Sequence, residues 1–141
     1  MYIDSIRDGI VLDHIKAGKA MEIYKSLGLK EVDCPVAMIM NVKSKRMGKK
    51  DIIKIDSLFS VDLDVLGYID PGITVNIIRD GKLAEKRALS LPEKITGILV
   101  CKNPRCITSC EQGIEHMFFL ADKEKGVYRC AYCEARHNEN F

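Results

Sequence analysis

Five of the six cysteines in this chain of 141 residues lie between positions 101 and 133, and this clustering constrains the fold more than any other feature. Four of the five form two close pairs, Cys101-x4-Cys106 and Cys130-x2-Cys133. Two short loops that each supply two thiolates are a common way to hold zinc in a tetrahedral site. Because four protein ligands leave no position for water, this spacing predicts one structural Zn²⁺ ion. The alternative is that the four cysteines pack as small apolar side chains.

Three further residues near these pairs are metal ligands by type. We expect Cys110 to be a free thiol, and His116 and His137 to be ordinary surface or core histidines. The zinc enzymes that deaminate nucleobases carry His-x-Glu before their Cys-x-x-Cys loop, whereas here His137-Asn138-Glu139 follows it. The sequence also contains no phosphate-binding loop, dinucleotide glycine pattern or Ser/His/Asp signature. We therefore expect that the chain itself is not an enzyme.

The cysteine distribution also divides the chain near Leu91-Pro92. We expect one domain over residues 1–92 and a second over residues 93–141, which is too short to bury a large core without a metal. The longest apolar stretches, such as residues 36–40, are too short to cross a bilayer. The first residues show no secretory signal. We therefore expect a cytoplasmic protein that makes no membrane contact and keeps its thiols reduced.

The first domain shows alternating strand and helix patterns. Apolar residues in the segment 17–27 recur at spacings of three and four, which predicts a helix that ends at Gly28. Ser60 is expected to cap a second, short helix. We expect strands over residues 3–14, 36–42, 52–58, 73–79 and 82–87, with Asp80-Gly81 as a type I′ turn. Strand-like runs at 117–121 and 127–128 follow. The order predicts an α+β fold, a ferredoxin-like antiparallel sheet with two helices on one face, plus a small C-terminal all-β zinc domain.

Residues 43–54 form a basic run with a local charge of +5, although the whole chain has a net charge of only +2. Such a run is usually a solvated hairpin, but a role in binding phosphate is the alternative. Strand alternation places Ile52 and Lys54 on one face, and Lys86 belongs to a neighbouring strand of the predicted sheet. Asp13 and His14 close the first strand. A carboxylate there could accept hydrogen bonds from ribose hydroxyls, and an imidazole could meet phosphate.

Several stretches, in this order along the chain, resemble the regulatory chain of aspartate carbamoyltransferase, the non-catalytic subunit of an enzyme of pyrimidine biosynthesis. They include residues 9–15 (GIVLDHI), 47–55 (MGKKDIIKI), 90–93 (SLPE) and both cysteine pairs. The resemblance implies an allosteric domain that binds CTP as inhibitor and ATP as activator, with UTP as a further ligand. It also implies a zinc domain that contacts catalytic chains, with Asn103 and Glu134 at positions that face them. The implied assembly is a dodecamer of two catalytic trimers and three regulatory homodimers.

The resemblance also implies the nucleotide-binding residues. Asp13 and Lys54 match ribose-binding positions, and His14 and Lys86 match positions that contact phosphate. Asp4, Ile6, Asn76 and Ile78 match the positions that form the wall around the base, and Lys50 lies near them.

The main alternative to this family is a zinc-ribbon module that binds nucleic acid. Residues 95–141 carry six basic and six acidic residues, and four thiolates with one Zn²⁺ would add a charge of −2. A nucleic-acid surface generally requires a basic stripe. We therefore expect no nucleic-acid partner.

Overall fold

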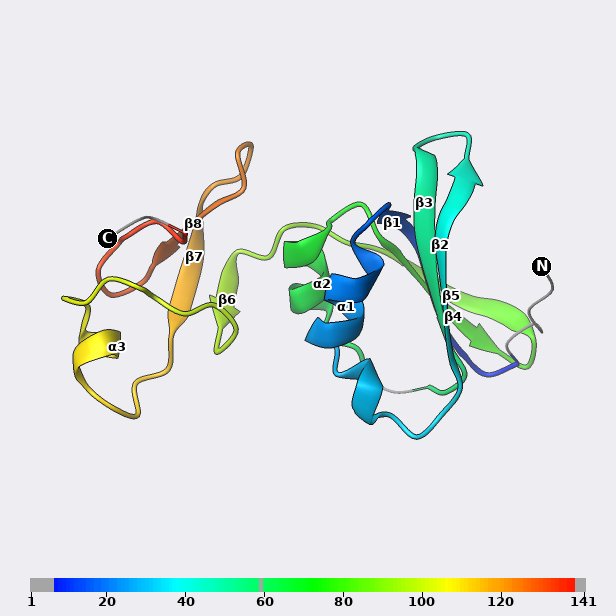
Figure 1. Cartoon of the computed structure of the whole chain (residues 1–141), viewed down its shortest axis with the longest axis horizontal. Helices are drawn as coiled ribbons and strands as arrows, with labels where there is room; N and C mark the ends of the chain where they lie inside the picture. Colours follow the sequence, from blue (N-terminus) through cyan, green and yellow to red (C-terminus); the bar gives the residue numbers. More distant parts are fainter. Residues whose placement is uncertain (1–6, 59, 139–141) are drawn as a thin grey trace. The chain divides into compact units, whose positions relative to one another are not determined.

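A computed structural model describes residues 7–58 and 60–138 of the chain (Figure 1). The chain divides into two compact units, Met1–Ser90 and Leu91–Phe141. We call them the sheet unit and the metal unit. No helix within the described residues is long and apolar enough to span a bilayer.

The sheet unit is built on one antiparallel sheet with the strand order β2-β3-β1-β4-β5. The strands are β1 (Gly9–Lys16), β2 (Val36–Ser44), β3 (Gly48–Ile55), β4 (Thr74–Arg79) and β5 (Lys82–Ala88). Helices α1 (Ala20–Ser26) and α2 (Leu63–Ile69) cover the same face of this sheet, and a short 3₁₀ helix, η1 (Leu29–Glu31), follows α1 (Figure 1). The predicted fold class is therefore confirmed.

The core of the sheet unit lies between the helices and the sheet. Along β3 the fully buried Asp51, Ile53 and Ile55 alternate with the partly exposed Ile52 and Lys54, so the first three side chains face the helices. The apolar residues of this core are Ile10, Leu12, Ile15, Ala20, Ile23, Leu29, Ile53, Ile55, Leu66, Ile73 and Val75. The opposite face of the sheet carries no helix among the described residues, and we call it the open face.

Two β-bulges interrupt the pairing on either side of β3. On β1 the register shifts between Leu12 and Ile15, and on β2 it shifts between Ile39 and Val42. Each bulge contains a residue with positive φ, His14 at 59° and Asn41 at 61°. Because Leu12 and Ile15 are both fully buried although three residues apart, Asp13 and His14 must both turn toward the open face.

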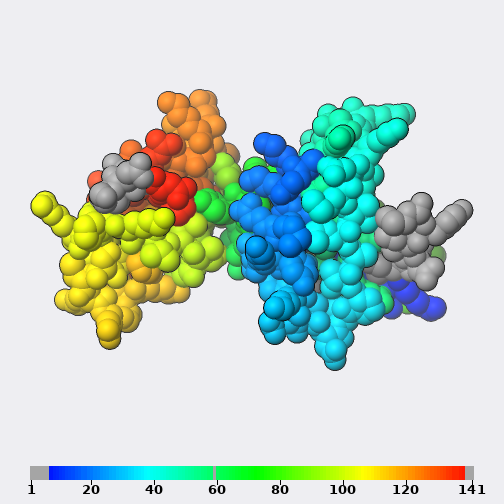
Figure 2. Space-filling model, in the orientation of Figure 1, coloured from blue at the N-terminus to red at the C-terminus, as the bar shows by residue number. Residues whose placement is uncertain are grey.

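The first part of the basic run, residues 43–49, forms the tip of the β2–β3 hairpin, which projects at the surface (Figure 2), and the rest continues along β3. Lys43, Lys45, Arg46 and Lys49 are exposed, as expected for a solvated hairpin. Because the hairpin is longer than predicted, β3 begins at Gly48 and not at residue 52. The next hairpin agrees with its prediction: Asp80 and Gly81 join β4 to β5 with φ values of 51° and 73°. All seven residues of β5, which forms an edge of the sheet, are exposed.

The predicted cap of α2 is wrong. The N-cap is Asp62, whose Oδ1 accepts hydrogen bonds from the backbone N–H groups of Asp64 (3.1 Å) and Val65 (3.2 Å). The helix begins at Leu63, so Ser60 lies two residues too early to accept these bonds.

Replacing Asp62 with alanine should therefore lower the stability of the sheet unit by about 1 kcal/mol, the usual cost of losing an N-cap. For a unit of this size, the melting temperature should fall by about 4–8 °C, which differential scanning calorimetry can measure. Ser60→Ala is the matched control and should leave the melting temperature unchanged. Equal shifts in the two variants would contradict the assignment of Asp62 as the cap.

The metal unit contains a second antiparallel sheet with the order β6-β7-β8. Its strands are β6 (Lys94–Thr96), β7 (Met117–Asp122) and β8 (Val127–Cys130). The last two were predicted from sequence. A single helical turn, α3 (Ile107–Cys110), begins directly after Cys106. Ile95, Phe118 and Tyr128 are buried together with three of the cysteines.

Candidate metal centre and nucleotide-binding face

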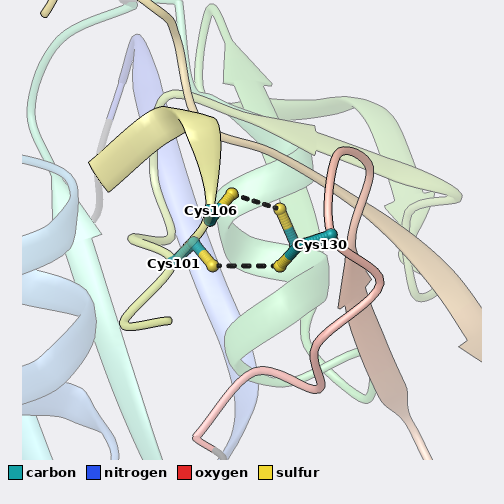
Figure 3. A group of neighbouring side chains, drawn as sticks. Cys101, Cys106 and Cys130 are labelled. Carbon is teal, nitrogen blue, oxygen red and sulfur yellow. Dashed lines mark hydrogen bonds between the residues drawn. The ribbon is translucent and has the colours of Figure 1, made fainter. Parts of the chain in front are cut away.

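The two cysteine pairs of the metal unit come together. Cys101 lies in the loop after β6, Cys106 is the N-cap of α3, and Cys130 ends β8, with Cys133 in the turn that follows. Their four Sγ atoms all lie within 4.8 Å of one another. Figure 3 shows the sulfur atoms of Cys101, Cys106 and Cys130 directed toward a common centre.

The geometry of this cluster fits zinc. The Sγ atoms of Cys101 and Cys133 are 3.6 Å apart, and those of Cys106 and Cys130 are 3.7 Å apart. A tetrahedron with Zn–S bonds of about 2.3 Å has edges of about 3.8 Å. The cluster of four cysteines is therefore a structural zinc site, in agreement with the spacing in the sequence.

The burial and close spacing of the four thiols also favour a bound cation, because thiolates in such a cluster need a compensating charge. Burial raises the pKa of the Cys101 thiol to about 12 and also raises the pKa of Cys130. Burial opposes ionisation of Cys106 as well, but hydrogen bonds from the side chain and backbone of Thr108 lower its pKa to about 7; the hydroxyl lies 3.1 Å from Sγ. Four thiolates at this spacing repel one another, and a divalent ion supplies the compensating charge.

The other candidate ligands lie outside the cluster. The Nδ1 atom of His116 accepts a hydrogen bond from the backbone N–H of Cys101 at 3.0 Å, so this histidine orients the first cysteine loop. The ring of His137 packs edge-on against Phe118. Cys110 is exposed, and its Sγ donates to the carbonyl oxygen of Pro104 at 3.4 Å. The roles of His116 and Thr108 could not be predicted from the sequence, because both depend on how the loops fold.

On the sheet unit, three of the residues predicted to bind nucleotide lie in one row across the open face. Lys54 on β3 is the register partner of Val11 on β1, which pairs with Asn76 on β4, and Asn76 pairs with Lys86 on β5. Neighbouring strands in a sheet are about 4.8 Å apart. The row therefore places the amide of Asn76 between two ammonium groups, that of Lys54 on one side and that of Lys86 on the other. Ile78 lies two residues beyond Asn76 on the same strand and the same face.

A second group lies beside this row, around the bulge of β1. The Nζ atom of Lys50 lies 2.9 Å from Oδ1 of Asp13. Burial raises the pKa of Asp13, but the hydrogen bond from Lys50 and the one from the His14 backbone N–H outweigh it, so the pKa lies below its ordinary value. The Nδ1 atom of His14 lies 3.1 Å from the Thr74 hydroxyl. Both donors to Asp13 use Oδ1, and no hydrogen bond to its Oδ2 is found within residues 7–58 and 60–138.

The remaining predicted residues are placed as follows. Asp4 and Ile6 lie outside the described residues. Asn103 is half-buried in the first cysteine loop, where its Oδ1 accepts a hydrogen bond from the backbone N–H of Arg105 at 3.1 Å. Glu134 is exposed after the second pair, with a φ of 62°. Sequence reasoning assigned no role to Asp51, whose buried carboxylate on the helix side of the sheet accepts three backbone hydrogen bonds, although a lone acidic residue within a basic run was visible in the sequence.

The fold and the site together define a two-domain protein, in which a ferredoxin-like unit with a polar open face precedes a unit organised by a structural metal. Comparisons with known proteins agree with this class. Residues 1–90 match the family model described as the aspartate carbamoyltransferase regulatory chain, allosteric domain. Residues 93–141 match the model of the metal binding domain of the same chain.

Curated relatives point to the same family. The aspartate carbamoyltransferase regulatory chain of Clostridium tetani is 56% identical over 133 residues, which cover 94% of this chain and 92% of the relative. The protein of the same name from Clostridium botulinum is 52% identical over 132 residues, covering 94% and 90%. The one from Bifidobacterium longum is 45% identical over 134 residues, covering 95% and 96%. The chain belongs to the family of aspartate carbamoyltransferase regulatory chains, as its sequence motifs indicated.

Proposed function

We propose that this protein is the non-catalytic, allosteric subunit of an aspartate carbamoyltransferase, and that it binds CTP as an inhibitor and ATP as an activator on the open face of the sheet unit. The observation that carries the proposal is the cross-strand row of Lys54, Asn76 and Lys86 beside Asp13 and His14. These side chains come from four strands, and together they offer cations, an amide and a carboxylate to one ligand.

Each part of a nucleoside triphosphate finds a suitable partner in this arrangement. The negative triphosphate requires cations and hydrogen-bond donors; Lys86 would supply a cation, and the imidazole of His14 would supply a hydrogen bond. Ribose hydroxyls would donate to Oδ2 of Asp13, the oxygen that neither Lys50 nor the His14 amide uses, and would accept from Lys54. The amide of Asn76 and the apolar side chain of Ile78 would form part of the wall around the base, together with Asp4 and Ile6 by resemblance to the family.

Regulation by two nucleotides at one site requires that they favour different states of the assembly. A ligand that binds both states equally shifts no equilibrium. CTP and ATP share the ribose and triphosphate, so the difference must arise at the base. The coupling to the catalytic chains would be about 1–3 kcal/mol, the usual range for allosteric effects.

The metal unit would transmit this coupling by docking on the catalytic chains. Ile98, Val100, Ile107 and Tyr132 are large apolar residues of this unit that remain exposed, and they are suited to a protein partner. Asn103 and Glu134, on the two cysteine loops, would lie at the same interface. The proposed assembly contains two catalytic trimers and three regulatory homodimers, in the cytoplasm, with UTP as a further ligand.

The test is calorimetric titration of the zinc-loaded protein with CTP and with ATP, alone and after assembly with its catalytic chains. We expect both nucleotides to bind competitively and the assembled enzyme to respond to them in opposite directions. Inorganic tripolyphosphate is the matched control, because it carries the phosphates without base or ribose, and it should bind more weakly. Tripolyphosphate binding as tightly as CTP and ATP would contradict a nucleotide site and indicate a simple anion site.

A further inference from the structure

Asp51 is a fully buried carboxylate in the middle of the sheet unit, with 0% of its surface exposed. Its Oδ1 accepts a hydrogen bond from the backbone N–H of Asn41 (3.0 Å), and its Oδ2 accepts from Gly18 (3.0 Å) and Ala20 (3.3 Å). Asp51 makes no salt bridge in the part of the chain that the structure describes. A buried charge is costly unless hydrogen bonds compensate it, so these three backbone groups are the partners that keep this carboxylate in the core.

The three donors lie at irregular points of the backbone. Asn41 belongs to the bulge of β2, and Gly18 and Ala20 lie where β1 turns into α1. Helix α1 has no cap of its own, because its N-cap residue, Lys19, makes no side-chain hydrogen bond to the helix. Asp51 therefore caps α1 from a distant strand.

Asp51 also holds the end of β1 through the sheet itself. It is the register partner of Ile15, the residue directly after the bulge that contains Asp13 and His14. One residue thus fixes the strand position after this bulge and, through its carboxylate, the turn that follows. Its side chain points toward the helices, away from the open face.

We propose that Asp51 is a positioning residue of the nucleotide site: it holds Asp13 and His14 on the open face without touching the nucleotide. This inference rests on the proposed function, because it assigns Asp51 to the same site. If the turn after β1 loosens, the bulge is no longer fixed at its far end. The Asp13 carboxylate and the His14 ring then lose their common orientation toward one ligand.

The test compares Asp51→Asn and Asp51→Ala in the full-length, zinc-loaded chain. Asparagine keeps one acceptor oxygen but turns an NH₂ group toward a backbone donor, so it is the milder variant. At a temperature where circular dichroism shows a folded chain, we expect Asp51→Asn to bind both CTP and ATP about tenfold more weakly, as measured by calorimetry. Asp51→Ala should bind them at least as weakly. The zinc content should not change, and NMR should show that the His14 ring has left Thr74.

The matched control is Ile23→Ala, which opens a cavity in the same core on helix α1 but leaves all three hydrogen bonds of Asp51 in place. This variant should lose thermal stability and keep its nucleotide affinity within about twofold. If Asp51 contributed only to stability, Ile23→Ala and Asp51→Asn would have the same affinity at equal stability.

Three outcomes would overturn the inference. A folded Asp51→Asn chain with wild-type affinity would show that Asp51 does not position the site. Failure of both Asp51 variants to fold would show that the whole unit, and not only the site, depends on it. If the unsubstituted chain binds neither nucleotide, the proposed function itself fails, and the inference fails with it.

Discussion

A chain in which serine replaces Cys130 is expected to lose its zinc and to unfold over residues 91–141, while the sheet unit stays folded. Cys130 is 0% exposed and ends β8, so its thiolate is fixed by the sheet that it helps to stabilise. A structural Zn²⁺ contributes about 10–16 kcal/mol at neutral pH. A unit of about 50 residues has a net stability of only about 3–8 kcal/mol. The free energy lost with the ion is therefore larger than the whole net stability of the metal unit.

Zinc content after dialysis against a chelator measures the first effect, and amide NMR spectra resolve the unfolding of one unit from the other. Cys110→Ser is the matched control, because this thiol is exposed and lies outside the cluster. It should keep one zinc per chain and an unchanged spectrum. A Cys130→Ser chain that retains zinc and stays folded would rule out a structural role for this site. We further expect the unfolded metal unit to abolish association with catalytic chains.

The second large effect is expected for Lys86→Ala, which should weaken CTP and ATP binding by similar factors. Lys86 would contact phosphate, and both nucleotides carry the same triphosphate. A hydrogen bond to a charged group contributes about 1.5–3 kcal/mol, which corresponds to a loss of affinity of about 10–100-fold. Titration calorimetry at fixed ionic strength measures it. The assembly state should not change, because Lys86 is an exposed residue on an edge strand.

Lys82→Ala is the control for this prediction. It removes the same charge from the same strand, but at the turn end, where Lys82 pairs with Arg79 and not with Asn76. We expect little change in affinity. A loss confined to one nucleotide in Lys86→Ala would mean that Lys86 recognises the base, and its assignment to the phosphates would be wrong. Equal losses in both variants would indicate a general effect of net charge.

Much of the fold could be predicted because its signals are local. Asp80-Gly81 adopts the positive φ angles that its residue types favour, and Gly28, also with positive φ, ends α1 as expected. The zinc site could be predicted because its ligands come as two short-range pairs. By contrast, β6 and α3 span only three and four residues, too few for any periodicity to be visible.

The arrangement of the proposed nucleotide-binding face could be predicted only in part. Alternation along β3 correctly separated Lys54 from the buried Ile53, but the alignment of Lys54 with Asn76 and Lys86 depends on the register between strands. That register lies beside irregularities in the pairing, one between Leu12 and Ile15 on β1 and one between Ile77 and Ile78 on β4. The carboxylate of Asp51, which we propose positions Asp13 and His14, accepts hydrogen bonds from backbone groups 10 to 33 residues away. Such long-range hydrogen bonds leave no local pattern in a single sequence.

The exposed edge strand β5 has a consequence for the behaviour of the protein in solution. An unpaired strand at the edge of a sheet can pair with the same strand of another molecule and start aggregation, and charged side chains on the edge oppose this. Four of the seven residues of β5 are charged: Lys82, Glu85, Lys86 and Arg87. Lys86 would then have two roles: it would bind phosphate, and its charge would oppose pairing of β5 with the same strand of another molecule. Variants that neutralise this strand should therefore be studied at low protein concentration, where pairing between the edges of two molecules is least favoured.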